Sequence, residues 1–121
     1  MNDQTIVVLG SFNANNGITT FVKRNYQRLT GLGWSFRFIN IANAKPARDL
    51  KQIGNYTEIK QLKKGPFQHF TELKRALKLN LKYSKTIHLH LDSLHNFLPI
   101  MLAKHIGYRR IIIHSHSDQR G

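Results

Sequence analysis

The sequence contains no cysteine, which excludes disulfide bonds, thiolate zinc sites and cysteine nucleophiles. It has only 3 prolines, and no apolar run approaches the ~20 residues that a membrane-spanning helix needs. The first ten residues lack the basic start and the small-residue cleavage site of a secretory signal. Disorder is excluded because 40% of the 121 residues are hydrophobic. These features predict a single domain over residues 1–121 and fit a cytoplasmic location.

Acidic residues are scarce, since 6 Asp and Glu stand against 19 Lys and Arg, for a formal net charge of +13. Between Lys60 and Lys85, eight basic residues accompany a single acid, Glu72, which leaves a local net charge of +7. Such a surface favours anionic partners, including an anionic membrane surface, phosphorylated ligands and nucleic acid. No helix-turn-helix, zinc-finger, RNA-recognition or K-homology motif is present, so we expect no nucleic-acid partner, although a basic nucleic-acid-binding domain stays an alternative.

Short β-branched runs alternate along the chain with apolar residues at helical spacing. The predicted strands are Ile6–Gly10, Trp34–Ile41, Tyr56–Leu62, Thr86–Leu91 and Arg109–His114. The predicted helices run from Gly17 to Gly31 or Gly33, from Gln68 to Tyr83 and from Ser93 to His105, with a loop and a helical turn over Asn43–Asn55. The first helix would place Phe21 and Tyr26 on its apolar face. This alternation predicts an α/β, Rossmann-like fold, with a mainly parallel sheet covered by helices and the strand order 3-2-1-4-5.

One edge of this sheet is the expected place for a ligand. Ligands of open parallel sheets bind beyond the carboxyl ends of the strands, near the point where the strand order reverses. There the loop from Ser11 to Gly17 leads into a helix N-terminus, whose free N–H groups favour a diphosphate. Gly17 has no side chain to hinder the approach of a ligand. The simpler interpretation of the same loop is a plain strand-to-helix turn.

Two histidine pairs, His88 with His90 and His114 with His116, end the last two predicted strands. Residues at i and i+2 on a strand share a face, so both rings of a pair point the same way. HLHLD is similar to motifs of adenosine-deaminase-like and metallo-β-lactamase-type metal sites, and neutral imidazoles suit zinc. The deaminase motif, however, opens the first strand of a barrel, and the lactamase motif has histidine where this chain has Ser93. We therefore expect no metal site, and a metal-dependent hydrolase or deaminase using both pairs stays the alternative.

The predicted helix over Gln68–Tyr83 is amphipathic and basic. An apolar stripe of Phe70, Leu73, Leu77 and Leu81 lies opposite Lys74, Arg75, Lys78 and Lys82. This pattern has two interpretations. The basic face either contacts anionic lipid head groups or is a solvated face of a helix that packs on the sheet.

Four stretches, in order along the chain, resemble motifs of family 4 glycosyltransferases of the GT-B fold, as found in bacterial exopolysaccharide and capsule biosynthesis. Residues 6–10, with GITTFV at 17–22, resemble the family's opening strand and its "G-G-x-E-x-F" helix start. TIHLH at 86–90 resembles "D-I-V-H-x-H", and LAKHIG at 102–107 resembles "A-x-x-x-G". Residues 110–117 resemble the strand end "I-x-H-S-H-x". The chain departs from the family pattern at Asn16, where the second glycine is usual, and at Thr19, where an acid is usual.

This resemblance implies the N-terminal, acceptor-side domain of a retaining glycosyltransferase whose C-terminal, donor-binding domain is absent from these residues. The donor would be a nucleotide-sugar and the acceptor a glycan or a lipid-linked sugar, with no metal or other cofactor. His116 would be the catalytic residue nearest the reacting sugar. Asn16 and Gly17 would lie by the diphosphate, and His90 and His114 would shape the pocket. The isolated domain would be inactive, and the whole enzyme would act in the cytoplasm, peripherally at the inner face of the membrane.

Overall fold

The computed structural model describes residues 4–14, 17–41, 45–59, 66–91 and 97–115. Its elements are β1 (Thr5–Gly10), α1 (Gly17–Thr30), β2 (Ser35–Asn40), the 3₁₀ helix η1 (Arg48–Gln52), β3 (Asn55–Glu58), α2 (Pro66–Leu81), β4 (Thr86–Leu91), α3 (Phe97–Ile106) and β5 (Arg110–Ser115). The five strands form one sheet in the order β3-β2-β1-β4-β5, and every pairing between them is parallel. The predicted fold class and strand order are confirmed.

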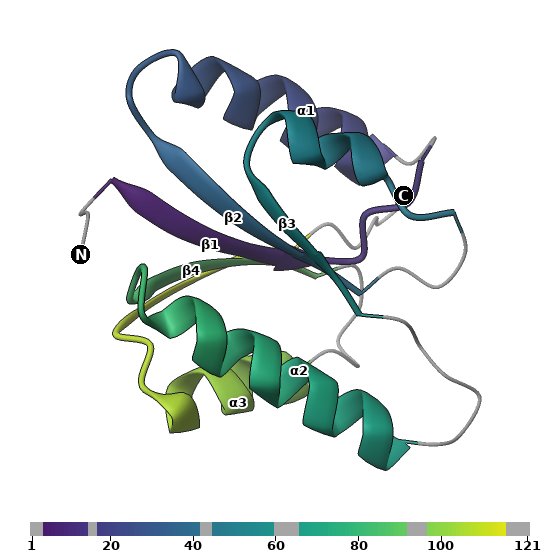
Figure 1. Ribbon diagram of the computed structural model, residues 1–121, viewed down its shortest axis with the longest axis vertical. Coiled ribbons are helices and arrows are strands. Elements are labelled where there is room, and N and C mark those ends of the chain that lie inside the picture. The colour runs from purple at the N-terminus through teal and green to yellow at the C-terminus, as the bar shows by residue number, and fades with distance from the viewer. Residues whose placement is uncertain (1–3, 15–16, 42–44, 60–65, 92–96, 116–121) are drawn as a thin grey trace.

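Helices cover both faces of the sheet (Figure 1). α1 and η1 lie over one face, and α2 and α3 lie over the other. Strand β1 has no solvent-facing side, because Ile6 and Val8 pack in the layer under α1 while Val7 and Leu9 pack in the layer under α2 and α3. This is why its sequence is continuously apolar rather than alternating.

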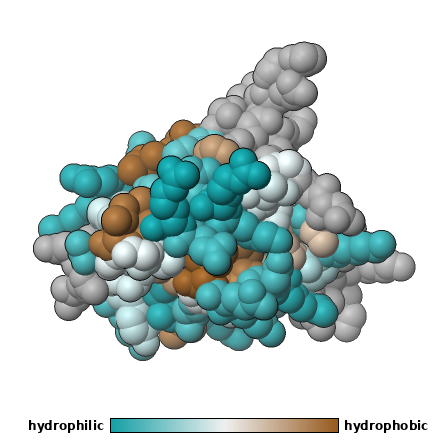
Figure 2. Space-filling view, turned by 90° about the horizontal axis from the view of Figure 1, so that it is seen from above, coloured by the Kyte–Doolittle hydropathy of each residue, from teal (hydrophilic) through white to brown (hydrophobic). Residues whose placement is uncertain are grey.

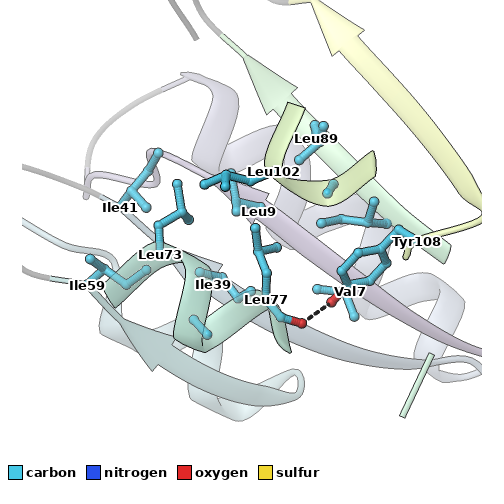
Figure 3. Close-up of a cluster of buried hydrophobic side chains, with 13 residues drawn as sticks. Val7, Leu9, Ile39, Ile41, Ile59, Leu73, Leu77, Leu89, Leu102 and Tyr108 are labelled. Atoms are coloured by element: carbon cyan, nitrogen blue, oxygen red, sulfur yellow. Dashed lines mark hydrogen bonds between the residues drawn. The ribbon is translucent and has the colours of Figure 1, made fainter. Parts of the chain in front are cut away.

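The larger apolar layer joins the sheet to α2 and α3 (Figure 3). Leu73 and Leu77 of α2 are buried there, with Phe70 and Leu81 partly buried beside them, so the predicted apolar stripe is confirmed. The hydroxyl of Tyr108 donates a hydrogen bond of 2.8 Å to the carbonyl oxygen of Leu77. This bond satisfies a polar group that burial would otherwise make costly.

Several predicted boundaries were wrong by a few residues. α2 begins at Pro66 rather than Gln68, because proline suits the first helical position, and it ends at Leu81, where the amides of Tyr83 and Ser84 both turn back to the carbonyl of Asn80. β3 is shorter than predicted, because it pairs with only four residues of β2. For α3, given as Phe97–Ile106, the predicted start at Ser93 lies outside the described residues and stays a prediction.

Two further expectations are corrected. Phe21, predicted on the apolar face of α1, has 49% of its surface exposed, because Val22 and Tyr26 occupy the face that meets the sheet. The helical turn predicted in the segment before β3 is confirmed as η1, but the segment packs tightly rather than forming an open loop, since it buries Leu50 and the preceding Ala47 in the layer under α1.

The outer surface is mainly hydrophilic. Viewed from the α1 side, Figure 2 shows hydrophilic side chains interrupted by separate hydrophobic areas. Ile112 and Ile113 of the last strand are 36% and 49% exposed. No helix within the described ranges is both long and apolar enough to cross a membrane.

Candidate functional site

The strand order reverses between β1 and β4, and three residues stand in a row at the carboxyl ends of β1, β4 and β5. Gly10 pairs in register with His90, and His90 pairs with His114. A Cβ added to Gly10 would lie 2.6 Å from the ring of Phe12 and 3.1 Å from the carbonyl oxygen of His90. Glycine is therefore needed here for the chain to turn closely past β4. This is the edge at which open parallel sheets bind ligands.

Three histidines and a tyrosine form one contact cluster on the α1 side of this edge. The Tyr26 hydroxyl lies 2.7 Å from Nε2 of His90 and 3.1 Å from Nδ1 of His88. The rings of His90 and His114 stack with centroids 4.5 Å apart and planes 6° apart, and the His88 ring lies 5.3 Å from that of His114. Because a hydroxyl carries one hydrogen, Tyr26 best donates to one imidazole and accepts from the other.

Burial lowers the pKa of two histidines of this cluster. The pKa of His88 is lowered from 6.5 to about 4. The main cause is burial, which removes water from the ring, and the smaller cause is electrostatic repulsion from His114. Burial also lowers the pKa of His114 and raises the pKa of Tyr26. His88 and His114 are therefore neutral imidazoles near pH 7, which can donate or accept hydrogen bonds as hydroxyl-rich ligands require.

A buried polar network holds the loop that connects β1 to α1. The Asn40 side chain accepts from the amide of Phe12 at 2.8 Å and donates to its carbonyl at 2.9 Å. Asn40 also donates to the Tyr56 hydroxyl, which donates to Glu58, and Glu58 is paired with Arg48. Burial raises the pKa of Tyr56 to about 12, so it stays a donor. Asn40 is therefore a positioning residue for the loop.

The N-terminus of α1 has features of an anion site. Among the described residues, apart from its chain neighbours and its own helix backbone, no atom lies within 4 Å of a Cβ built on Gly17, so their packing does not explain the glycine, while close approach of a ligand would. Thr19, in the first turn, is 2% exposed, and its hydroxyl makes no hydrogen bond within the described residues. Asn16 lies outside those residues.

The structure brings together some predicted residues and adds others. His90 and His114 are in contact, as a shared pocket requires, whereas His116, the predicted catalytic residue, lies outside the described ranges. Tyr26 was predicted only as an apolar helix position, and Asn40 only as part of a strand. Both residues lie far along the chain from their partners, so no local motif could reveal their roles.

The geometry does not favour the zinc alternative. No group of three His, Cys, Asp or Glu side chains in the described ranges could hold a metal ion. The rings of His90 and His114 are stacked face to face, and ring lone pairs lie in the ring planes, so they do not converge on one point between the rings. Asp92 and His116 lie outside those ranges.

The same fold occurs in solved structures of different function. A glycosyltransferase from Rickettsia africae matches with a TM-score of 0.67 and 18% identity, over 93% of this chain and 30% of that chain. Two structures of the C-terminal domain of a hydrogenase from Pyrococcus furiosus also match. The first has a TM-score of 0.61 and 12% identity, over 96% of this chain and 94% of that chain. The second has a TM-score of 0.62 and 11% identity, over 95% of this chain and 93% of that chain. No protein-family model and no curated protein sequence matches. These likenesses establish the fold, and this chain spans under a third of the glycosyltransferase.

The neutral histidine cluster predicts that stability falls in mild acid. The unfolded chain binds a proton at His88 near pH 6.5, whereas the folded chain does so only near pH 4, so the free energy of unfolding decreases as pH falls between these values. In urea unfolding across this range, the free energy of unfolding should depend less on pH in His88→Gln than in the wild type. The difference corresponds to up to about one proton taken up on unfolding. The exposed His105→Gln is the control and should keep the wild-type slope. An unchanged slope in His88→Gln would show that folding does not lower the pKa of His88.

Proposed function

We propose that this chain is the acceptor-side domain of a retaining glycosyltransferase that uses a nucleotide-sugar. The observation that carries the proposal is the row of Gly10, His90 and His114 at the strand-order reversal, beside the α1 N-terminus. Support also comes from the fold, which a glycosyltransferase shares over 93% of this chain. The sequence motifs that end β4 and β5 fit the same function.

In the proposed reaction, the bond between the anomeric carbon and the diphosphate breaks, and a bond to an acceptor hydroxyl oxygen forms. The acceptor proton leaves with the diphosphate, and the anomeric configuration is retained. Free N–H groups at the start of α1 and the buried Thr19 hydroxyl would stabilise the departing diphosphate. His90 and His114 would orient sugar hydroxyls, and His116 would lie nearest the reacting carbon. No metal is needed for these roles, and a second domain would complete the donor site.

Turnover by the enzyme that contains this domain tests the proposal. His116→Ala should lower kcat by about 10²-fold or more, since groups that act at the reacting centre typically contribute that much. His105→Ala, on the exposed side of α3, should keep wild-type turnover. The isolated 121 residues should show no transfer and only weak binding of a UDP-sugar. Wild-type turnover in His116→Ala, or tight stoichiometric UDP-sugar binding by the isolated chain, would contradict the proposal.

We also propose that the outer face of α2 contacts an anionic membrane surface, where lipid-linked acceptors reside. A shallow groove of about 510 Å³ runs along this face and is lined by Thr71, Lys74, Arg75, Lys78, Leu79 and Lys82. Leu79 lies 48% exposed among these four cations. Cations around an exposed leucine suit an interface with lipid head groups outside and acyl chains below. Each basic residue near such a surface contributes about 1 kcal/mol of attraction.

Vesicle sedimentation tests this surface. The chain should bind phosphatidylcholine vesicles that contain phosphatidylglycerol but not phosphatidylcholine alone, and added salt should weaken the binding. Lys74→Glu with Lys78→Glu should abolish it. The control, Arg24→Glu with Arg28→Glu on exposed positions of α1, makes the same charge change and should largely preserve it.

Other outcomes would overturn the membrane proposal. Equal binding to both vesicle types, or binding to neither, would leave the α2 cations as a solvated face. Tight binding to random-sequence duplex DNA that is lost in Lys74→Glu with Lys78→Glu and falls steeply with salt would assign the face to nucleic acid instead.

A further inference from the structure

The amino edge of the sheet, opposite the candidate site, contains a second groove of about 450 Å³. Thr5, Ser35 and Asn55, the first residues of β1, β2 and β3, lie along it, together with Trp34, Arg37 and Tyr83. Figure 1 shows this edge at the left, away from the carboxyl ends of the strands. None of these residues takes part in the proposed glycosyl transfer, so the groove needs its own explanation.

Arg37 is the charged group of this groove, and the protein holds it in one position. Its Nε donates a hydrogen bond of 2.7 Å to Oδ1 of Asn80, whose amide nitrogen is itself bonded to the carbonyl of Ala76 at 2.8 Å. The guanidinium carbon lies 3.7 Å from the centre of the Tyr83 ring. Because the guanidinium is already held on two sides, binding a ligand would cost little further side-chain entropy.

No carboxylate balances this charge within the described ranges. Asp49 and Glu58 are paired with Lys23 and Arg48. Glu72 lies eight residues before Asn80 on α2, about 12 Å along the helix axis. In the described part of the chain, Arg37 bonds through Nε to Asn80, and its terminal nitrogens have no acceptor there. Partly buried guanidinium groups in this state are suited to carboxylate or phosphate oxygens.

The surroundings of the groove are basic as well. Lys85, Arg109 and Arg110 lie together at the same edge, because the amides of both arginines donate to the carbonyl oxygen of Lys85. Arg28 lies in the last turn of α1, whose final residue, Thr30, lines the groove. A cation at a helix C-terminus, such as Arg28, is explained by the helix dipole. Arg37 lies within a strand, so the helix dipole does not explain it. The edge as a whole would attract an anion, and Arg37 would give it a fixed partner.

The groove also offers an aromatic wall and polar groups. Trp34 is partly buried, Tyr83 is 45% exposed, and Ser35 and Asn55 supply a hydroxyl and an amide. Aromatic side chains beside placed polar groups are typical of sites for small ligands. We propose that this amino-edge groove binds a sugar-sized anion, with its carboxylate or phosphate on Arg37.

Trp34 is the only tryptophan of the chain, so its fluorescence reports on the groove directly. Titration with glucuronate and with glucose 1-phosphate should give saturable changes, while neutral glucose should bind at least tenfold more weakly. Whichever anion binds more tightly identifies the carboxylate or the phosphate as the preferred group. Arg37→Gln should weaken binding at least tenfold. Arg110→Gln, which removes one charge from the same edge outside the groove, should weaken it less than twofold.

A second variant covers the case in which Arg37→Gln does not fold. Ser35→Phe places a ring in the groove from an exposed position and leaves Arg37 intact, so it should also abolish binding. Unchanged affinity in folded Arg37→Gln or in Ser35→Phe would overturn the proposal, as would equal binding of glucose. Because none of these residues lies at the carboxyl edge, loss of this binding and loss of glycosyl transfer would be separate results.

Discussion

The arrangement of the candidate site depends on one buried hydroxyl, that of Tyr26. It joins α1 to the sheet by bonding to His88 and His90 of β4, and it lies in the layer where Phe36 and Phe38 pack. A tyrosine suits this place because its ring fills the apolar layer while its hydroxyl pairs two imidazoles that burial would otherwise strand. The same contact sets where α1 begins relative to the end of β4. The helix N-terminus and the histidines are thereby held at one edge.

The two edges of the sheet have different electrostatics. At the carboxyl edge, burial lowers the pKa of His88 and of His114, so the cluster provides neutral hydrogen-bonding groups. At the amino edge, Arg37 keeps its positive charge and has no described acid beside it. A neutral polar pocket suits hydroxyl-rich substrates, whereas a fixed guanidinium suits an anion. The excess of basic residues in the sequence is therefore distributed among distinct surfaces rather than spread over one.

Much of the fold was predictable from local patterns, and much of the site was not. The β-branched runs and helical stripes predicted the parallel sheet and its strand order, because burial on both faces leaves a direct mark on each strand. The alternation of His88 with His90 correctly placed both on one face. Tyr26 and Asn40 act through partners 16 to 64 residues away, which periodicity cannot reveal. Phe21 was misjudged because an apolar residue at the border of a helical stripe can point to either side.

The central claim is that the carboxyl edge at the junction of β1 and β4 receives the nucleotide-sugar. The most direct measurement is an amide NMR titration of the isotopically labelled chain with a UDP-sugar at millimolar concentration. The account predicts that weak binding shifts the amides of Gly10, Gly17, Thr19, His90 and His114. Shifts confined to the amino edge, or no shift at any residue, would contradict it.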